Sequence, residues 1–380
     1  MNKEKIAIIV GTRPEAIKLA PLCIALREDD FEVTVVGTGQ HTEMIAGILE
    51  FFGVRIDITL DITRKTGSLS ELSSELLMQI EKVLLEVRPS MVLVQGDTTS
   101  AYIGALCAFY LKIPVGHVEA GLRTDEKYSP FPEEINRRLI SEITDLHFAP
   151  TQTAAKNLEP KQHVFVTGNT VIDALLLAKK TIAESAQVYQ EKYRSVLNPG
   201  NRNVLITGHR RESIGEGFRN IFQAINELAH EFSHYNFVYP VHLNPNVREA
   251  VSQYLEDRSN IFLLDPIPYD HLLFCLSRSY LVLTDSGGIQ EEAPSFNIPV
   301  IVMRNHTERM EGVEANCAIL AGTQKQAIVE TFRQLMHDQE LYERMQRAEN
   351  PYGDGNTSNR IVKAIKEIIP SRVKKKNAAG

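Results

Sequence analysis

Short runs of apolar residues alternate with longer segments of helical periodicity along almost the whole chain. The run IAIIV at residues 6–10 comes before a predicted helix at 14–27, and FEVTVVGT, MVLVQ and IPVGHV continue the series. A further helix is predicted from Ser68 to Val87, because Ser68 and Glu71 form the pattern of a capping box. Unbroken β-branched runs between helices are typical of a parallel sheet that helices cover on both faces.

The same alternation starts again in the second half, after a long helix predicted at 171–193 and the break LNPGNRN. The runs NVLITG, NFVYPVH, NIFLLD, YLVLTD and PVIVM each come before a helical segment. Two βα series in a chain of 380 residues indicate an α/β protein with two doubly wound, Rossmann-like domains. We expect these domains at 1–170 and 171–355, with a helix at 356–370 packed on the first and a basic flexible tail at 371–380.

Charge and composition argue against several classes of protein. The formal net charge of −7 disfavours a nucleic-acid partner, because phosphates bind basic surfaces. The four cysteines are widely spaced and form no Cys-x-x-Cys pair, so we expect reduced, buried thiols in a cytoplasmic protein and no metal site. The apolar run near the start is broken after five residues by GTRP, which indicates a strand rather than a signal peptide. No apolar run reaches the length of about 18 residues that spans a membrane.

The unusual polar residues follow the predicted strands, and in open α/β sheets ligands bind beyond the carboxyl ends of the strands. The first strand ends in GTRPE, where Gly11 allows a tight turn and Arg13 lies at a helix N-terminus. This is either an anion site or an ordinary βα turn with a surface arginine. If the two domains face each other, we expect such loops to line one central cleft.

The strand YLVLT ends in the turn Asp285-Ser286-Gly287-Gly288. Serine and two glycines at a strand-to-helix turn expose backbone N–H groups to a phosphate, and Glu292 follows one helical turn later, where a carboxylate can bind ribose hydroxyls. The chain has no Walker pattern, and its GEG sequence at 215–217 lacks the third glycine of a dinucleotide fingerprint. The alternative is a purely structural turn.

A histidine and two arginines follow the strand NVLIT, in the sequence GHRRE. His209, Arg210 and Arg211 are suited to bind a pyrophosphate, although a solvated basic turn is an equal alternative. Asp97 follows MVLVQG and Glu119 follows PVGHV, so both carboxylates stand at the ends of predicted strands. With Glu133 and Glu134 they supply candidate groups for acid–base catalysis.

Nine motifs follow one another across essentially the whole chain: GTRPEAIK, QGDTTS, GHVEAGLRT, SPFPEEINRR, TGNTVIDAL, TGHRRES, YPVHLNPNVRE, LTDSGGIQEEAPS and NPYGDGNTSNRI. With them the sequence resembles the non-hydrolysing UDP-N-acetylglucosamine 2-epimerases. The resemblance implies two Rossmann-like domains of the glycosyltransferase-B type around a central cleft, and a homodimer. It also implies reversible conversion of UDP-N-acetylglucosamine to UDP-N-acetylmannosamine, without cofactor or metal, for bacterial cell-surface polysaccharides.

Two routes can change the configuration of carbon 2, whose proton is not acidic. Oxidation by a nicotinamide cofactor is disfavoured, because the dinucleotide fingerprint is absent. Elimination of UDP gives a 2-acetamidoglucal, to which UDP adds again while a proton arrives on the opposite face. This route needs a diphosphate site and acid–base groups on both faces of one carbon.

The resemblance assigns residues to these roles. Asp97, Glu119 and Glu133 match the catalytic carboxylates of the family, and His209 matches the histidine near the diphosphate. We expect Asp97 and Glu119 to act at carbon 2, while Glu133 holds hydroxyls or relays the proton. The residues that match UDP contacts, or that lie beside them, are Arg13, Lys18, Arg137, His242, Ser286, Gly287, Gly288, Glu292 and Arg309.

One stretch departs from the family pattern. Many bacterial members bind a second substrate molecule as an activator through a Gln-His-x-Gln stretch and an arginine in a following loop. Here Gln40 and His41 are followed by Glu43 in place of the second glutamine, and Arg64 is the candidate arginine. The other members of that site are present, namely Glu134, Arg210 and His242. We expect catalysis to be retained, and a sigmoidal velocity curve would show that activation is retained as well.

Three other functions fit parts of the sequence. A hydrolysing relative would release UDP and free N-acetylmannosamine. A glycosyltransferase of the same fold would need an acceptor site, and the basic membrane patches that often accompany it are not found. A non-catalytic sensor of nucleotide sugars would not require Asp97, Glu119 and Glu133 together, and Glu119→Gln would leave its function intact.

Overall fold

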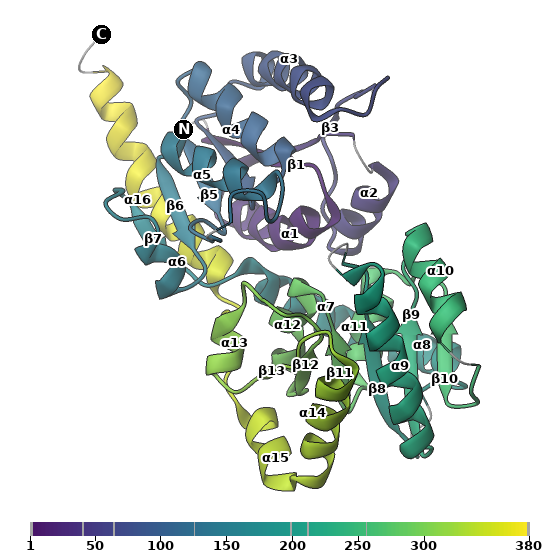
Figure 1. The fold of residues 1–380 in the computed structure, drawn as a ribbon. Helices are drawn as coiled ribbons and strands as arrows, with labels where there is room; N and C mark the ends of the chain where they lie inside the picture. Colours follow the sequence, from purple (N-terminus) through teal and green to yellow (C-terminus); the bar gives the residue numbers. More distant parts are fainter. Residues whose placement is uncertain are drawn as a thin grey trace. The chain divides into compact units, whose positions relative to one another are not determined.

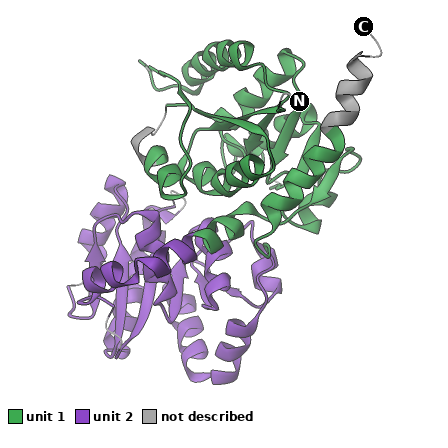
Figure 2. Cartoon of the chain, turned by 180° about the vertical axis from the view of Figure 1, so that it is seen from behind, with its two compact units in different colours: residues 1–177, 352–380 green, residues 178–351 purple. Residues whose placement is uncertain are grey.

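The computed structural model describes residues 3–39, 42–63, 65–124, 126–197, 200–210, 213–255 and 257–377. The chain divides into two compact units, residues 1–177 with 352–380 and residues 178–351 (Figure 2). Each unit contains a parallel sheet packed with helices (Figure 1), as the two βα series predict. The first boundary falls within a helix, seven residues after the limit of 170 expected from the sequence.

In the described part of the first unit, the sheet has seven parallel strands in the order β3-β2-β1-β4-β5-β6-β7. This order places β4 between β1 and β5. The strands β3, β6 and β7, which have two to four residues, are not predicted from the hydrophobic pattern. The strands are β1 (Lys5–Val10), β2 (Glu32–Gly37), β3 (Ile58–Thr59), β4 (Met91–Gln95), β5 (Val115–Val118), β6 (Leu146–Ala149) and β7 (Val164–Val166).

Two groups of helices cover this sheet (Figure 1): α1, α2 and α16 pack together, and α3 packs on α4, which packs on α5. The Ser68 side chain accepts a hydrogen bond of 3.2 Å from Glu71 N, which confirms one half of the predicted capping box. The Glu71 carboxylate bonds instead to the backbone N–H groups of Lys65 and Thr66. The helices are α1 (Arg13–Glu28), α2 (Thr42–Phe51), α3 (Leu69–Val87), α4 (Thr99–Tyr110), α5 (Glu133–Ile143), α6 (Gln152–Lys156), α7 (Thr170–Glu184) and α16 (Thr357–Asn377).

The C-terminal helix belongs to the first unit. It packs on α1, and an ion pair of 2.6 Å joins Lys366 to Asp29 at the end of α1. The helix continues to Asn377, so residues 371–377, which the sequence pattern assigns to a flexible tail, are helical.

In the described part of the second unit, the sheet has six parallel strands in the order β10-β9-β8-β11-β12-β13. The helix predicted at 171–193 is two helices, because the backbone of Ser185 leaves the helical conformation at φ −112°. The strands are β8 (Arg202–Thr207), β9 (Tyr235–Pro240), β10 (Ile261–Leu264), β11 (Leu281–Thr284), β12 (Val300–Val302) and β13 (Ala318–Leu320). The helices are α8 (Ala186–Tyr193), α9 (Glu216–Glu231), α10 (Pro245–Tyr254), α11 (Tyr269–Ser277), α12 (Gly287–Glu292), the 3₁₀ helix η2 (Ala293–Phe296), α13 (Met310–Glu314), α14 (Lys325–His337) and α15 (Gln339–Arg347).

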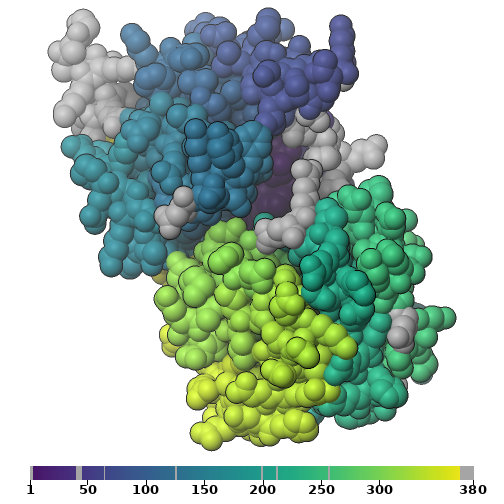
Figure 3. Space-filling view, in the orientation of Figure 1, coloured from purple at the N-terminus to yellow at the C-terminus, as the bar shows by residue number. Residues whose placement is uncertain are grey.

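Helices α9 and α14 lie side by side on the surface of this unit (Figure 3). Arg333 of α14 forms ion pairs with Glu227 and Glu231 of α9, at 2.9 and 2.6 Å. These groups are partly exposed, so the pairs contribute little beside the apolar core that both helices cover.

All four cysteines lie in the described part of the chain and are buried and free of disulfides, which confirms the expected thiols. Burial raises the pKa of Cys23 to about 12, so this thiol stays protonated. In the same part of the chain, no helix is both long enough and apolar enough to cross a bilayer.

Candidate active site

The order of strands in the first unit brings two predicted carboxylates to one edge of the sheet. Glu119 directly follows β5, and Asp97 comes two residues after the neighbouring strand β4. A β carbon added at Gly96 would lie 3.8 Å from Glu119 Oε2, so the Glu119 side chain points toward the turn that carries Asp97. The carboxyl ends of adjacent parallel strands thus bring these two groups together, as the sequence predicts.

Glu119 has an unusual backbone conformation, with φ at +64°. Residues other than glycine rarely adopt this left-handed region of backbone conformation, and such backbone strain is concentrated at functional sites. The Glu119 carboxylate is buried and accepts hydrogen bonds from Lys18 Nζ at 2.6 Å, from Asn169 Nδ2 at 3.0 Å and from Gln95 Nε2. Three donors from separate segments therefore hold the carboxylate of a residue whose backbone is strained.

Two of these donors are absent from the residues predicted for the site. Gln95 is the last residue of β4, and Asn169 lies between β7 and α7. Both belong to motifs that carry the family resemblance, QGDTTS and TGNTVIDAL, and that is the signal by which they could have been found. Lys18, predicted as a neighbour of the ligand, is 7% exposed and pairs with Glu119. It therefore stabilises the charge of a catalytic candidate.

Asp97 is held from helix α5. Arg137 donates to Asp97 Oδ2, and Asn136 Nδ2 donates to the Asp97 carbonyl oxygen at 2.9 Å. Burial raises the pKa of Asp97, and the positive charge of Arg137 opposes that rise. A carboxyl group whose pKa is raised by burial and that lies beside a second carboxylate is a candidate for proton exchange with a substrate.

Helix α5 begins at Glu133, which is partly buried, and continues with Glu134, which is fully buried. Glu134 Oε2 accepts from Thr124 N at 2.9 Å, and Glu134 Oε1 accepts from Arg138 Nε at 2.6 Å. Arg137 Nη1 lies 3.4 Å from the same carboxylate. These contacts fasten the charged loop to α5, and the role of Glu134 in an activator site stays a prediction.

Arg13 is the first residue of α1, two residues after the Gly11 turn. Its side chain is partly buried and forms no hydrogen bond or ion pair with another residue in the ranges that the structure describes. A guanidinium at a helix N-terminus without a protein partner is suited to bind an anion.

In the second unit, β8 and β11 are neighbours, and their ends carry His209 and Asp285. Asp285 is fully buried, and its Oδ2 accepts from the backbone N–H groups of His209 at 2.8 Å and Arg210 at 2.9 Å. His209 Nδ1 lies 3.6 Å from Asp285 Oδ1. The ring of His209 stacks on that of His242, with 5.1 Å between centroids. Asp285, which was not predicted as a site residue, therefore shapes the turn that presents two basic groups.

The predicted phosphate turn lies at the start of α12, where Ser286 is the N-cap residue. A β carbon added at Gly287 would lie 3.1 Å from the guanidinium carbon of Arg309, so the absence of a side chain lets Arg309 lie against the turn. Glu291 holds that guanidinium through a bond of 3.0 Å to Nε. Glu292 is buried, and its carboxylate accepts a hydrogen bond of 2.9 Å from Tyr269 Oη, which fixes the orientation of the carboxylate. The turn thus combines backbone N–H groups with a fixed cation.

The departure from the family pattern lies largely outside the described residues. Gln40, His41 and Arg64 are not described, and neither is the side chain of Glu43. The predicted activator site is therefore untested at these positions.

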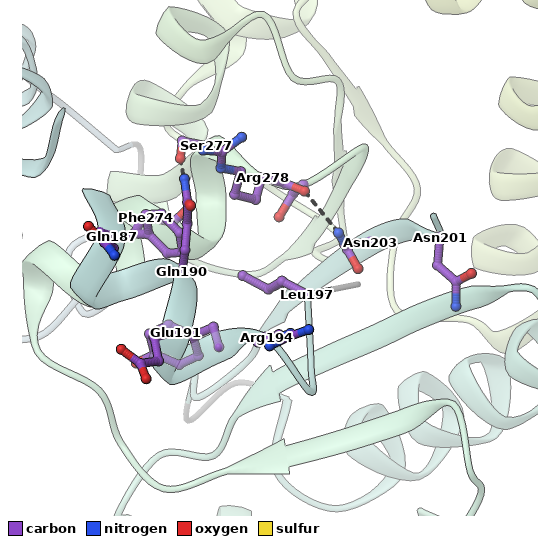
Figure 4. A pocket seen from close by; sticks show the side chains of 12 residues that line it. Gln187, Gln190, Glu191, Arg194, Leu197, Asn201, Asn203, Phe274, Ser277 and Arg278 are labelled. Carbon is purple, nitrogen blue, oxygen red and sulfur yellow. Dashed lines mark hydrogen bonds between the residues drawn. The ribbon is translucent and has the colours of Figure 1, made fainter. Parts of the chain in front are cut away.

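A pocket of about 830 Å³ lies in the second unit, lined by α8, the start of β8 and the end of α11 (Figure 4). Tyr193, Asn203 and Arg278 are among its residues, and none of the predicted site residues is. It lies at the amino end of β8, whereas His209 follows the carboxyl end. This pocket is not the candidate active site.

Known proteins resemble this chain over nearly its full length. A family model for UDP-N-acetylglucosamine 2-epimerase matches residues 24–366. The UDP-N-acetylglucosamine 2-epimerase of Yersinia pestis is 46% identical over 370 residues, which cover 95% of this chain and 98% of the relative. The crystal structure of the Neisseria meningitidis UDP-GlcNAc 2-epimerase bound to UDP-GlcNAc is 43% identical with a TM-score of 0.92, and the match covers 96% of this chain and 100% of that one.

A more distant solved structure, the glycosyltransferase SnogD from Streptomyces nogalater, is 14% identical with a TM-score of 0.58 and covers 100% of both chains. A likeness at this identity shows the fold alone, and with the closer match it confirms Rossmann-like units of the glycosyltransferase-B type. The family match and the level of identity decide the relationship: the chain belongs to the UDP-N-acetylglucosamine 2-epimerase family, whose members are isomerases.

Proposed function

We propose that this protein interconverts UDP-N-acetylglucosamine and UDP-N-acetylmannosamine by eliminating UDP and adding it back. The observation that carries the proposal is the pair of carboxylates at the ends of β4 and β5, Asp97 with Arg137 and Glu119 with Lys18. An epimerisation by elimination needs two groups that exchange protons at one carbon. The family match and the epimerase bound to UDP-GlcNAc support the choice of substrate.

The first step removes the proton from carbon 2 while the bond from carbon 1 to the diphosphate oxygen breaks. The products are enzyme-bound UDP and 2-acetamidoglucal, in which carbons 1 and 2 share a double bond. The second step re-forms the bond between carbon 1 and oxygen and delivers a proton to carbon 2 from the opposite face. Atoms and charges balance without an oxidant, because the electron pair of the C–H bond returns to a new C–H bond.

Asp97 and Glu119 act at carbon 2 in this proposal, and Glu133 holds sugar hydroxyls or relays the proton. A positioned acid or base of this kind contributes about 10²–10⁴-fold to a rate. A group that accepts a proton and a group that donates one make opposite demands on a carboxyl group, and the surroundings of the two groups differ in the same way. Lys18 stabilises the charge of Glu119, whereas burial raises the pKa of Asp97.

In the second unit, the turn 286–288 and Arg309 bind the diphosphate in the proposal, and Arg13 is a further candidate for anion binding in the first unit. Backbone N–H groups and guanidinium groups stabilise the charge that develops on the leaving UDP. His209 assists departure of the UDP, and Glu292 binds the ribose, with its carboxylate oriented by Tyr269.

The test follows the reaction in deuterated water without added cofactor. We expect deuterium at carbon 2 of both epimers, because the proton removed in the first step exchanges with solvent. Glu119→Gln should slow this exchange by at least about 10²-fold, since it removes one acid–base group. The matched control is Glu126→Gln, which makes the same change of charge at an exposed residue of the same loop and should exchange normally.

The outcomes separate the competing reactions. Epimerisation without deuterium at carbon 2 would exclude the elimination route. Accumulation of free N-acetylmannosamine with UDP would show a hydrolysing enzyme instead.

We also propose a cytoplasmic homodimer. The four buried, unpaired thiols suit a reducing compartment, and the family resemblance implies the dimer. Light scattering of the purified chain should give twice the mass of the monomer, and a monomer at micromolar concentration would contradict this proposal.

A further inference from the structure

A buried carboxylate that the proposed reaction does not use lies beside the active-site loops. Glu15 occupies the first turn of α1 and is 1% exposed. A buried carboxylate without a charged partner is costly, so its presence requires a compensating set of hydrogen bonds.

The bonds of Glu15 reach two different strand ends. Glu15 Oε2 accepts from Gly11 N at 2.9 Å, in the turn that follows β1. Glu15 Oε1 accepts from Thr98 Oγ1 at 2.6 Å, in the turn that follows β4. Thr12 gives further hydrogen bonds to the same carboxylate. One side chain therefore bridges the β1–α1 and β4–α4 turns.

These two turns carry groups of the proposed reaction. Arg13 follows the Gly11 turn, and Asp97 immediately precedes Thr98. Thr98 is also the N-cap residue of α4, because its side chain accepts from Ala101 N at 3.1 Å. The position of Thr98 therefore fixes both the start of α4 and the peptide that holds Asp97.

The Gly11 turn is rigid enough to serve as the reference for this bridge. A β carbon added at Gly11 would lie 2.4 Å from Ser100 Oγ and 2.8 Å from Thr38 Oγ1, so the turn is packed without space. The hydroxyls of Thr38 and Ser100 are themselves 2.9 Å apart. The bond from Thr98 to Glu15 then sets the Asp97 turn against this packed turn.

We infer that Glu15 is a positioning residue of the epimerisation, which holds the Asp97–Thr98 turn in register with the Gly11–Arg13 turn through its two carboxylate oxygens. The inference rests on the proposed function, since it concerns the placement of Asp97 for proton transfer. Displacing a catalytic group by about 1 Å can cost 10²-fold in rate. Loss of the bridge should therefore lower kcat more than it lowers UDP affinity.

The test compares Glu15→Met, which has a similar volume but cannot form either hydrogen bond, Thr98→Val and the double variant with the wild-type enzyme. The measurements are kcat, deuterium exchange at carbon 2 and UDP affinity in calorimetry. Each single variant should lower kcat and exchange at least about tenfold, while the UDP Kd changes less than about threefold. The double variant should be no slower than the slower single variant, because both changes break one bond. Thr98→Ser keeps the hydroxyl and should restore the rate.

A matched control separates positioning from the loss of a helix cap. Thr151 caps α6 in the same unit by accepting from Ala154 N at 3.1 Å, so Thr151→Val removes a cap away from Asp97 and should keep kcat within about twofold. Hydrogen exchange of β1 and β4 shows whether the variants are folded.

The inference is overturned if Glu15→Met keeps kcat within about twofold, if Thr151→Val loses as much rate as Thr98→Val, or if UDP affinity falls as far as kcat. Absence of deuterium exchange in the wild-type enzyme would overturn the proposed function itself, and the two failures are therefore distinct.

Discussion

Replacement of Glu15 by glutamine tests the structure through the pH dependence of stability. Burial raises the pKa of Glu15 from 4.5 to about 7, and the donors that contact it, from Gly11, Thr12 and Thr98, are all neutral. In the unfolded chain the group ionises near 4.5, so between pH 4.5 and 7 the folded protein binds the extra proton. The contribution of Glu15 to stability is therefore fully present below pH 4.5 and is lost as the pH rises through 7.

The magnitude follows from the same values. A difference between 4.5 and about 7, at about 1.4 kcal/mol per pH unit, corresponds to about 3 kcal/mol of unfolding free energy at pH 8. Glu15→Gln keeps the shape and an acceptor but does not ionise. Part of this effect is already lost at pH 5, so the unfolding free energy of the variant relative to wild type should rise by about 2.5 kcal/mol between pH 5 and pH 8, whatever the offset at pH 5.

The assay is native-state hydrogen exchange of peptides from β1 and β4, because these report the first unit without assuming that both units unfold together. Variant and wild type are compared at each pH, which cancels the intrinsic dependence of exchange on pH. Glu71→Gln is the control with the opposite sign, since hydrogen bonds from Lys65 and Thr66 lower the pKa of Glu71 to about 2. That contribution is lost only as pH falls toward 2, so the control should show a constant difference over pH 5–8. A constant difference for Glu15→Gln would refute the reasoning.

Three further changes have outcomes that the structure predicts. Lys18→Met leaves the buried Glu119 carboxylate without its cation, so denaturant unfolding should show a loss of about 3–5 kcal/mol in the free energy of unfolding. Adding Glu119→Gln should recover this stability but not the activity. An unchanged free energy of unfolding in Lys18→Met would contradict the pairing. Asp285→Asn weakens the acceptor of two backbone N–H groups in the basic turn, so the UDP Kd in calorimetry should rise about tenfold, and an unchanged Kd would argue against that turn as the diphosphate site. Gly121→Ala places a β carbon 2.1 Å from a backbone oxygen and should destabilise by more than about 2 kcal/mol, whereas Gly53→Ala, also at positive φ but with nothing within 4 Å, should cost about 1 kcal/mol in the same assay.

The pattern of the sequence identified both βα series, the predicted strands of each unit and the start of α3, because these depend on periodicity and capping that are local to the chain. It also placed Asp97, Glu119, His209 and the glycine turn at strand ends, since a strand-end position follows from the strand itself. Short strands such as β7 and β13 escaped the pattern, because three residues give too little periodicity to recognise.

Only the tertiary structure decided what these strand-end groups contact. Lys18 and Glu119 are 101 residues apart in sequence, and they pair because β1 and β5 both adjoin β4. The burial of Glu134, and the bridge that Glu15 makes to Thr98, depend in the same way on segments that meet through the order of strands. The sequence by itself determined the longer elements, the residue types at their ends and the family. Strand order and burial decided which carboxylates are paired, because solvation and ion pairing arise only between groups that folding brings together.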